Sequence, residues 1–440
     1  MMDAWRMLNS LNRPQRNTFI ASFLGWALDA FDFFLVVLVV PAIAKDFVPA
    51  KNGAVDTVPV AFAITLTLAM RPIGALIFGV LADRFGRRLP LMIDIAFYSV
   101  MEFATAFSPN LTVFLILRAL FGIGMGGEWG IGASLAMESL PTESRGLFSG
   151  ILQEGYAFGY LLAAVVAALA FPIIGWRGMF LIGTLPALMV LFIRVGVPES
   201  PVFEERRTRN LASATGMLAA LQRRWPLFLY LVVLMTAFNF MSHGSQDIYP
   251  TFLQKQVGLT VSGSSAVAII YNIGAICGGI FFGYNSQRWG RRRAIAIAAA
   301  LGILLIPLWA GLVSFAVGAL AIGAFLMQFM VQGAWGVIPV HLNELSPGAV
   351  RGTFPGLAYQ LGNLCAAITP TLVTAYAQGL GSVKHPSFSL AQAILIAGVF
   401  AAVIVITWLG PEVRAKTFQV AEDEELGAQT LPSARRSGMA

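Results

Sequence analysis

The sequence predicts an all-α membrane protein in which twelve transmembrane helices form two pseudo-symmetric bundles of six. Of its 440 residues, 57% are hydrophobic and only 12% are charged, whereas soluble domains average about 25% charged residues. Apolar stretches of roughly 20 residues recur along the chain, and motifs of the first half return in the second. This composition excludes a water-soluble globule and, with it, a soluble enzyme.

Twelve apolar stretches are long enough to cross a bilayer. Because a bilayer offers no water to backbone polar groups, spans of this kind have to be helical. In the first half they lie near residues 17–43, 58–82, 89–107, 111–137, 145–170 and 177–196. In the second half they lie near residues 225–252, 262–284, 293–313, 316–344, 351–378 and 388–410.

The basic residues predict the orientation of these spans. Of the 29 Lys and Arg residues, 22 fall on the side that holds both termini, 5 fall on the other side and 2 lie within spans. Positive charge collects on the cytoplasmic side of membrane proteins, so we expect cytoplasmic N- and C-termini in a plasma membrane, the inner membrane of a bacterium. The net charge of +7 therefore reflects topology and not a nucleic-acid surface.

A loop between the second and third spans returns in weaker form between the eighth and ninth. The block Gly79 to Arg88 recurs 204 positions later as Gly283 to Arg292, with Gln287 in place of Asp83. Glycines allow close helix approach, and a carboxylate accepts hydrogen bonds from a helix N-terminus. We expect the motif to act in gating and conformational change through Gly79, Asp83, Arg84, Gly86, Arg87, Arg88, Gly283, Gly290 and Arg291.

A second block repeats at an offset of 206, where Glu138 and Arg145 match Glu344 and Arg351. Two blocks in the same order at nearly the same offset indicate an internal duplication. Parallel six-helix repeats with a substrate path between them are one plan of membrane transporters. We therefore predict four parts: an N-terminal bundle at 1–197, a polar cytoplasmic linker at 198–224, a C-terminal bundle at 225–410 and a cytoplasmic tail at 411–440.

Ionisable residues within spans are expensive and are usually functional or paired. Seven acids are assigned there, against two arginines and His243, and this imbalance suits a proton carrier. The three histidines of the chain show no metal-ligand spacing, and we expect no metal, no cofactor and no nucleic-acid partner. The acids are Asp29, Asp32, Asp94, Glu102, Glu128, Glu154 and Asp247.

The seventh span carries one polar face on an apolar helix. At 100° per residue, five polar side chains fall within an arc of about 140°, which indicates a face that lines a cavity. A polar seam between two helices is the alternative. The five residues are Asn239, Ser242, His243, Gln246 and Asp247.

Arg118 in the fourth span begins a run with glycines at 122, 124 and 126. A fixed guanidinium there could hold a carboxylate through two parallel hydrogen bonds, and a role in helix packing is the alternative. The glycine run mimics a nucleotide-binding fingerprint, but no strand precedes it, so close helix packing is the better account.

These motifs resemble a known family of transporters. The loop G-x-x-x-D-R-x-G-R-R at 79–88 resembles the signature of the major facilitator superfamily, whose weaker copy stands at the same place in the second half. The stretch 239–250 resembles the helix-7 element of the Jen-type monocarboxylate permeases, in the sialate and lactate proton-symporter branch, with Asn239, Ser242, Ser245 and Gln246 at its defined positions. His243 stands where many members have leucine. Segments 25–34, 331–336 and 359–363 also resemble that branch.

The resemblance implies a functional monomer that carries a small organic anion of the lactate or pyruvate type together with a proton, by alternating access. We expect substrate binding by Arg118, Asn239, Ser242, Gln246 and Gln360, and proton coupling by Asp29, Asp32, His243, Asp247 and Glu154. A sugar:proton symporter is an alternative, because Pro198 to Pro201 and Pro411-Glu412 look like sugar-porter marks. A sialic acid symporter is another, because sialic acid is also a carboxylate and belongs to a sister branch. A membrane nutrient sensor without transport is a further alternative.

Overall fold

The computed structural model describes residues 6–7, 9–49, 56–209, 214–382, 385–413 and 418, and within these ranges the chain forms helices and no strand. The first half contains α2 (Arg13–Phe47), α3 (Val58–Phe85), α4 (Arg88–Ala106), α5 (Leu111–Ser139), α6 (Arg145–Gln153), α7 (Gly155–Ile182), α8 (Ala187–Gly196) and α9 (Pro201–Thr208). The second half contains α10 (Ala214–Gln246), α11 (Tyr249–Lys255), α12 (Val261–Trp289), α13 (Arg291–Trp309), α14 (Val317–Trp335), α15 (Ile338–Leu345), the 3-10 turn η1 (Gly348–Val350), α16 (Phe354–Ala366), α17 (Thr369–Leu380) and α18 (Phe388–Leu409).

Ten helical stretches of the described chain are long and apolar enough to cross a membrane. The difference from the predicted twelve has two causes. The predicted spans 145–170 and 177–196 lie in one run, Arg145–Gly196, whose backbone leaves the helical conformation at Gly175. The predicted span 351–378 is divided between α16 and α17, each of which is short.

Several spans are broken where the apolar pattern alone predicts one helix. The seventh, tenth and eleventh spans restart as α11, α15 and α17, and each of these begins with a proline in its first turn. Proline has no N–H to donate to the preceding turn, so it favours a fresh helix start. Hydropathy detects the span but not these breaks.

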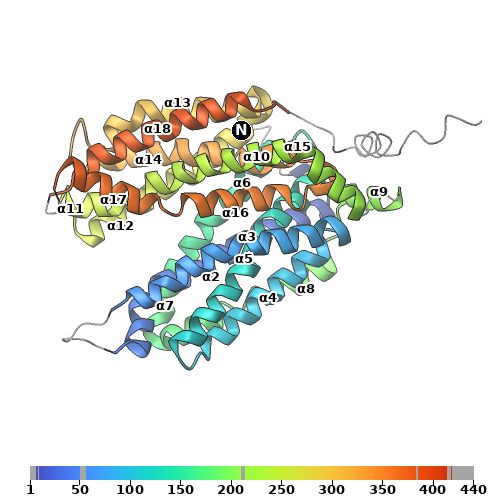
Figure 1. Cartoon of the computed structure of the whole chain (residues 1–440), viewed down its shortest axis with the longest axis horizontal. Coiled ribbons are helices and arrows are strands. Elements are labelled where there is room, and N and C mark those ends of the chain that lie inside the picture. The colour runs from blue at the N-terminus through green and yellow to red at the C-terminus, as the bar shows by residue number, and fades with distance from the viewer. Residues whose placement is uncertain are drawn as a thin grey trace, which may run out of the picture.

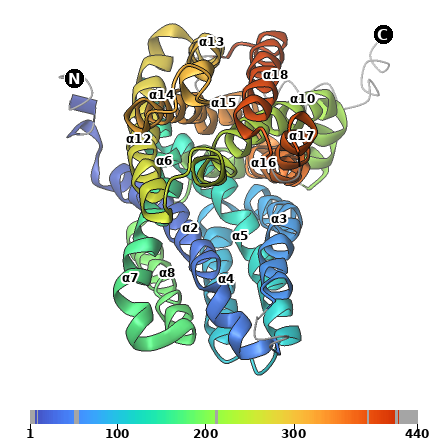
Figure 2. The same cartoon turned by 90° about the vertical axis from the view of Figure 1, so that its left-hand side faces the viewer.

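The two bundles meet at one end of the molecule and spread apart toward the other (Figure 1). The meeting end carries both arginine-rich loops, at 84–88 and 288–293, and is called the arginine-rich end below. Figure 2 shows the two bundles end-on, with α2 to α5, α7 and α8 in one and α10 to α18 in the other, while α6 of the first half lies beside α12. This arrangement confirms the predicted fold of two pseudo-symmetric bundles.

Glycines bring corresponding helix pairs together in both bundles. A Cβ atom at Gly122 or Gly126 of α5 would lie only 2.3 or 2.0 Å from a carbonyl oxygen of α3. In the second bundle, a Cβ atom at Gly278 of α12 would lie 2.0 Å from the carbonyl oxygen of Phe329 in α14. The glycine run after Arg118 thus serves close helix packing, as the sequence predicts.

The structure describes the predicted linker and tail only in part. The linker 198–224 contains α9 and the first turns of α10. Ser200 caps α9 by accepting a hydrogen bond from the Phe203 N–H at 3.2 Å. Most of the predicted tail 411–440 lies outside the described residues, apart from 411–413 and Phe418.

Candidate functional site

Arg71 lies at the junction of the two bundles. It stands on α3, is 2% exposed, and its guanidinium carbon lies 6.0 Å from the ring centroid of Tyr359 on α16. Within the part of the chain that the structure describes, its Nε and Nη2 atoms have no hydrogen-bond partner and it forms no ion pair. Since a buried charge without a partner is costly, this is a position where a bound anion would be stabilised.

Aromatic rings from both bundles surround this junction. Trp129 of α5 lies 4.7 Å from Tyr359, and Trp335 of α14 lies 5.6 Å from it, measured between ring centroids. Trp26 of α2 stacks on Tyr156 of α7 at 5.4 Å. The indole N–H groups of Trp26 and Trp335 are buried and have no hydrogen-bond partner among the described residues. The junction therefore offers donors that a ligand could engage.

Gln360 faces the first bundle from α16. Gly356, one turn earlier on the same helix, contacts Gly130 of α5, and residues four apart share a helix face. Gln360 is 1% exposed, and neither atom of its amide has a partner in the described chain. It belongs with Arg71 among the polar groups that the fold leaves unsatisfied between the bundles.

The polar face of the seventh span lies at the end of α10. His243 Nδ1 is 2.9 Å from Asp247 Oδ2, and its Nε2 is 2.9 Å from Asn363 Oδ1 on α16. Gln246 donates to the hydroxyl of Ser242. The structure therefore brings four of the five predicted residues into two adjacent hydrogen-bonded pairs.

Asn239, the fifth residue of that face, is tied to its own helix. It is 3% exposed, and its amide donates to the Met235 carbonyl at 2.8 Å. One of its two amide donors is thus occupied by the backbone, so Asn239 contributes less to an open polar surface than the sequence predicts.

Arg118 is not at the junction, contrary to the expectation from sequence. It is 0% exposed inside the first bundle, where it donates to Glu102 and to the Thr105 hydroxyl, both at 2.7 Å. Phe121 and Phe180 lie against its guanidinium carbon at 4.4 and 5.1 Å. All these partners belong to the first bundle, so the structure does not bring Arg118 together with Gln246. The physical reason is Glu102, which supplies the carboxylate that we had assigned to a substrate.

The predicted acids of α2 are buried among other carboxyls. Asp29 and Asp32 are both 0% exposed, and their oxygens have no hydrogen-bond partner within the described chain. The charge of Arg71 acts on Asp29. Asp32 lies beside Glu102, since a Cβ atom at Gly183 would be 2.9 Å from Asp32 Oδ1 and 2.8 Å from Glu102 Cγ. Asp29 is thus the acid of this pair that lies closer to the junction.

Glu154 lies between the two bundles, at the break between α6 and α7. It is 5% exposed, and its Oε1 has no hydrogen-bond partner among the described residues. A Cβ atom at Gly279 of α12 would lie 2.0 Å from this oxygen. The carboxyl thus packs directly on the backbone of the opposite bundle at this glycine.

Asp83 joins the bundles at the arginine-rich end. Its carboxylate accepts hydrogen bonds from the N–H of Gly352 at 2.7 Å and from the N–H and hydroxyl of Thr353 at 3.0 and 2.7 Å. Gly79 permits this approach, because a Cβ atom there would lie 2.8 Å from Thr353 Cα. Three charge-assisted bonds from the second bundle thus converge on one buried carboxylate.

Arg87 extends this contact into an ion-pair network. It pairs with Asp83 at 3.2 Å and donates twice to Glu138, at 3.1 and 3.2 Å. Glu138 also pairs with Arg351 of the second bundle at 3.4 Å. Gly86 follows α3 with φ 96°, a conformation that favours glycine. Arg84 is exposed, and Arg88 donates to the Arg194 carbonyl, so these two stay within the first bundle.

The second copy of the motif makes a weaker version of the same contact. Arg291 pairs with Glu344 at 2.9 Å, as Arg87 does with Glu138, and Gly290 repeats the φ of 96°. Gln287, in place of the acid, donates one bond of 3.1 Å to the Thr142 carbonyl of the first bundle. Gly283 packs on the backbone of α6, where a Cβ atom would lie 2.7 Å from the Gly146 carbonyl.

Phe418 adds an aromatic contact at this end. Its ring is 7% exposed, and the guanidinium carbons of Arg145 and Arg351 lie 3.9 and 4.0 Å from its centroid. These two arginines occupy matching positions of the internal repeat, one in each bundle. The arginine-rich end is therefore closed by hydrogen bonds, ion pairs and one ring held between two cations.

The sequence reasoning found Arg71 within a span but gave it no role. The sequence does contain one indication of a role for Arg71: no acid lies three or four residues away from it on the same helix. A partner for its charge therefore has to come from another helix or from a ligand. The same test does not separate it from Arg118, whose partner Glu102 comes from α4. Only the packing of the helices distinguishes the two arginines.

Two bundles that enclose unsatisfied buried charge between them define a multi-pass membrane transporter. The Sugar (and other) transporter family matches residues 17–224, and the Major Facilitator Superfamily matches residues 239–438. A Saccharomyces cerevisiae carboxylic acid transporter protein homolog is 30% identical over 90% of this chain and 68% of that protein. The Escherichia coli sialic acid transporter NanX is 27% identical over 96% of this chain and 99% of that protein. The chain belongs to the major facilitator superfamily, in its carboxylate and sialate branch, and its relatives are transporters and not enzymes.

A solved structure supports the fold. The proton:xylose symporter XylE, bound to 6-bromo-6-deoxy-D-glucose, matches with a TM-score of 0.75 over 94% of this chain and 99% of that one. The two sequences are 19% identical, so this likeness concerns the architecture alone.

Proposed function

We propose that the protein is a proton-coupled symporter of a small carboxylate, of the lactate or pyruvate type, that works by alternating access as a monomer. The observation that carries this proposal is Arg71, a buried guanidinium between the bundles with two nitrogens unsatisfied among the described residues. A planar guanidinium matches a carboxylate with two parallel hydrogen bonds. Arg71 takes the role that the sequence analysis gave to Arg118, with Gln360, Ser242 and Gln246 as further polar groups.

The proton has three candidate positions. Asp247 is hydrogen-bonded to His243 at 2.9 Å, Asp29 feels the charge of Arg71, and Glu154 is a carboxyl between the bundles without a hydrogen-bond partner for its Oε1 in the described chain. A carboxyl that binds a proton before the bundles move would cross the membrane uncharged, which lowers the cost of the transition. Asp32 lies beside Glu102 inside the first bundle, so it is a less favoured proton carrier than Asp29.

The closed arginine-rich end supports an assignment of the resting state. By the positive-inside rule this end faces the cytoplasm, in a bacterium on the inner face of the inner membrane. The arrangement described here then corresponds to a state sealed on the cytoplasmic side, from which anion and proton enter on the opposite side. Breaking the contacts of Asp83 and Glu138 would be part of the step that releases them inside.

Uptake into proteoliposomes tests the proposal. Labelled lactate should accumulate when the outside is acidic relative to the lumen, and a protonophore should abolish the accumulation. Asp247→Asn, Asp29→Asn and Glu154→Gln, compared singly, should identify the proton carrier as the variant that still exchanges lactate but no longer responds to the pH gradient. Transport of xylose or glucose without any carboxylate transport would contradict the proposal.

Sialic acid is a second candidate because the E. coli relative named for it aligns over nearly the whole chain. It is also a carboxylate, so it would engage Arg71 in the same way. Competition of labelled lactate uptake by unlabelled sialate, pyruvate, acetate and succinate separates the two candidates. Inhibition by sialate alone would replace lactate as the proposed substrate.

A further inference from the structure

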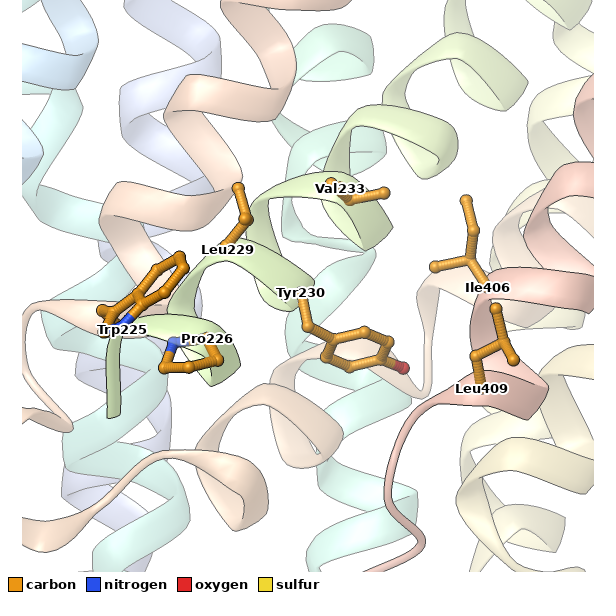
Figure 3. A pocket seen from close by; sticks show the side chains of 7 residues that line it. All are labelled: Trp225, Pro226, Leu229, Tyr230, Val233, Ile406 and Leu409. Carbon is orange, nitrogen blue, oxygen red and sulfur yellow. The ribbon is translucent and has the colours of Figure 1, made fainter. Parts of the chain in front are cut away.

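An apolar groove of about 310 Å³ lies on the second bundle, between the start of α10 and the end of α18. Five of its lining residues stand on α10 between Trp225 and Val233, and the other two are Ile406 and Leu409 of α18 (Figure 3). It lies apart from the junction described above, since none of its lining residues belongs to the site around Arg71.

The groove is open to the surroundings of the bundle. Trp225 is 60% exposed and Leu409 is 80% exposed, and both side chains are apolar. Apart from the Trp225 indole N–H, the lining side chains offer one polar atom, the Tyr230 hydroxyl. This hydroxyl is buried and has no hydrogen-bond partner in the described chain. In a membrane-spanning bundle such a surface meets hydrocarbon. The shape and chemistry of the groove therefore suit an acyl chain.

Positive charge flanks the groove where it reaches the arginine-rich end. At 100° per residue, Arg223 projects within about 20° of Tyr230 along α10. On the other side, Arg292 donates to the carbonyls of Thr407 and Trp408 at the end of α18, which holds its guanidinium beside Leu409. Glu412, the nearby acid, already accepts the N–H groups of Arg291 and Arg292.

We propose that this groove binds one anionic glycerophospholipid of the leaflet at the arginine-rich end. One acyl chain lies in the groove between α10 and α18, and the phosphate lies between Arg223 and Arg292. Arg223 can offer its planar donors to phosphate, whereas Arg292, whose Nε and Nη2 donate to α18 carbonyls, contributes chiefly its charge. Tryptophan favours the membrane interface, and the exposed indole of Trp225 suits that environment.

The chain offers a matched control for the charge. Arg224 follows Arg223 directly, yet at 100° per residue it projects about 120° away from Tyr230, on the other side of α10. Arg223→Gln and Arg224→Gln therefore remove the same charge at nearly the same depth, and only the first removes it from the groove. Any effect of net charge or of expression should appear in both variants.

Photo-crosslinking in nanodiscs tests the site independently of transport. Phosphatidylglycerol with a diazirine in its acyl chain should label peptides that contain residues 225–233 and 406–409, and unlabelled phosphatidylglycerol should compete better than phosphatidylcholine. Arg223→Gln should reduce that preference by about fivefold, the effect of about one charge at a membrane surface, and Arg224→Gln should leave it unchanged. Val233→Trp should fill the groove and remove the labelling of 406–409.

Three results would overturn the proposal: labelling spread evenly over the apolar surface, an unchanged preference in Arg223→Gln, or an equal loss in both arginine variants. The two arginine variants change an exposed side chain, so they keep the test decisive even where Val233→Trp does not fold. Size-exclusion profiles of each variant in the same detergent supply the folding control.

Discussion

Arg71 and Arg118 are both buried in the first bundle, yet their surroundings differ. Arg118 has a carboxylate at 2.7 Å and two aromatic rings within 5.1 Å. Arg71 faces the opposite bundle, with Tyr359 at 6.0 Å and two nitrogens unsatisfied within the described chain. A guanidinium that is already neutralised holds helices together, whereas one without a partner is available to a ligand.

The largest effect is expected from Arg71→Ala. Loss of one partner of a desolvated charge pair weakens binding by about 2–5 kcal/mol, so lactate uptake should fall by at least about 30-fold while the unfolding temperature changes little. Arg71→Lys should restore part of the activity, since it keeps the charge but loses the paired geometry. Counterflow rates and thermal unfolding measured on the same samples check this.

Arg177→Ala is the matched control for that experiment. Arg177 pairs with Asp46 at 2.7 Å, and the side chains of both are exposed by more than two fifths. Exposed pairs contribute little, so its removal should leave uptake unchanged. Normal uptake by Arg71→Ala would exclude the guanidinium from substrate binding.

Arg118→Leu should act through stability. It leaves Glu102 as a buried charge without its partner, which costs about 3–5 kcal/mol, and the protein should unfold at a markedly lower temperature. The double variant Arg118→Leu/Glu102→Leu should recover most of the loss, because apolar residues can replace both charges. A stable Arg118→Leu protein that no longer binds lactate would reinstate Arg118 as the anion ligand.

A smaller effect is expected at the arginine-rich end, where the two copies of the loop differ in one residue. Asp83→Ala removes three hydrogen bonds to a charged acceptor, each of which contributes about 1.5–3 kcal/mol, whereas Gln287→Ala removes one neutral bond to the first bundle. Spin labels at the exposed positions 143 and 288, in a background with Cys277 and Cys365 replaced by serine, report the separation of the bundles.

In that measurement Asp83→Ala should move the distance distribution toward larger separations, and Gln287→Ala should move it less. Equal shifts in the two variants would mean that the acid of the first copy contributes no more than the amide of the second.

The smallest effect is expected from Phe418→Ala. A desolvated cation–π contact contributes about 2 kcal/mol, so the loss of two such contacts should give a spin-label shift below that of Asp83→Ala, which removes three charge-assisted hydrogen bonds. Phe418→Leu keeps the apolar burial and removes the aromatic face. If Phe418→Leu behaves as the unchanged protein does, burial and not the ring's charge distribution closes this end.

The two-bundle fold could be predicted from the sequence because apolar length and internal duplication can be read from the chain itself. The spans, the two halves and the paired loops followed from apolar length and from motifs at a nearly constant offset. The distinction between Arg71 and Arg118 could not follow, since it depends on which helix supplies a carboxylate. Glu102 lies 16 residues from Arg118, and no local spacing rule joins them.

The breaks within spans were missed for a related reason. Glu154 lies in an apolar run that reads as one helix, and its position between α6 and α7 becomes evident only with Gly279 of α12 packed against it. The roles of residues that depend on contacts between the bundles thus cannot be predicted from a single sequence.

Gly146 and Gly150 of α6 lie against Gly283 and Gly279 of α12, so that at these points the bundles touch through bare main chain. Surfaces of this kind have no interlocking side chains to disengage, and they can part and return without repacking a core. The barrier to movement at this contact then comes from the few polar bonds beside it. A substitution among those bonds is therefore expected to change how readily the bundles separate, without altering the groups around Arg71.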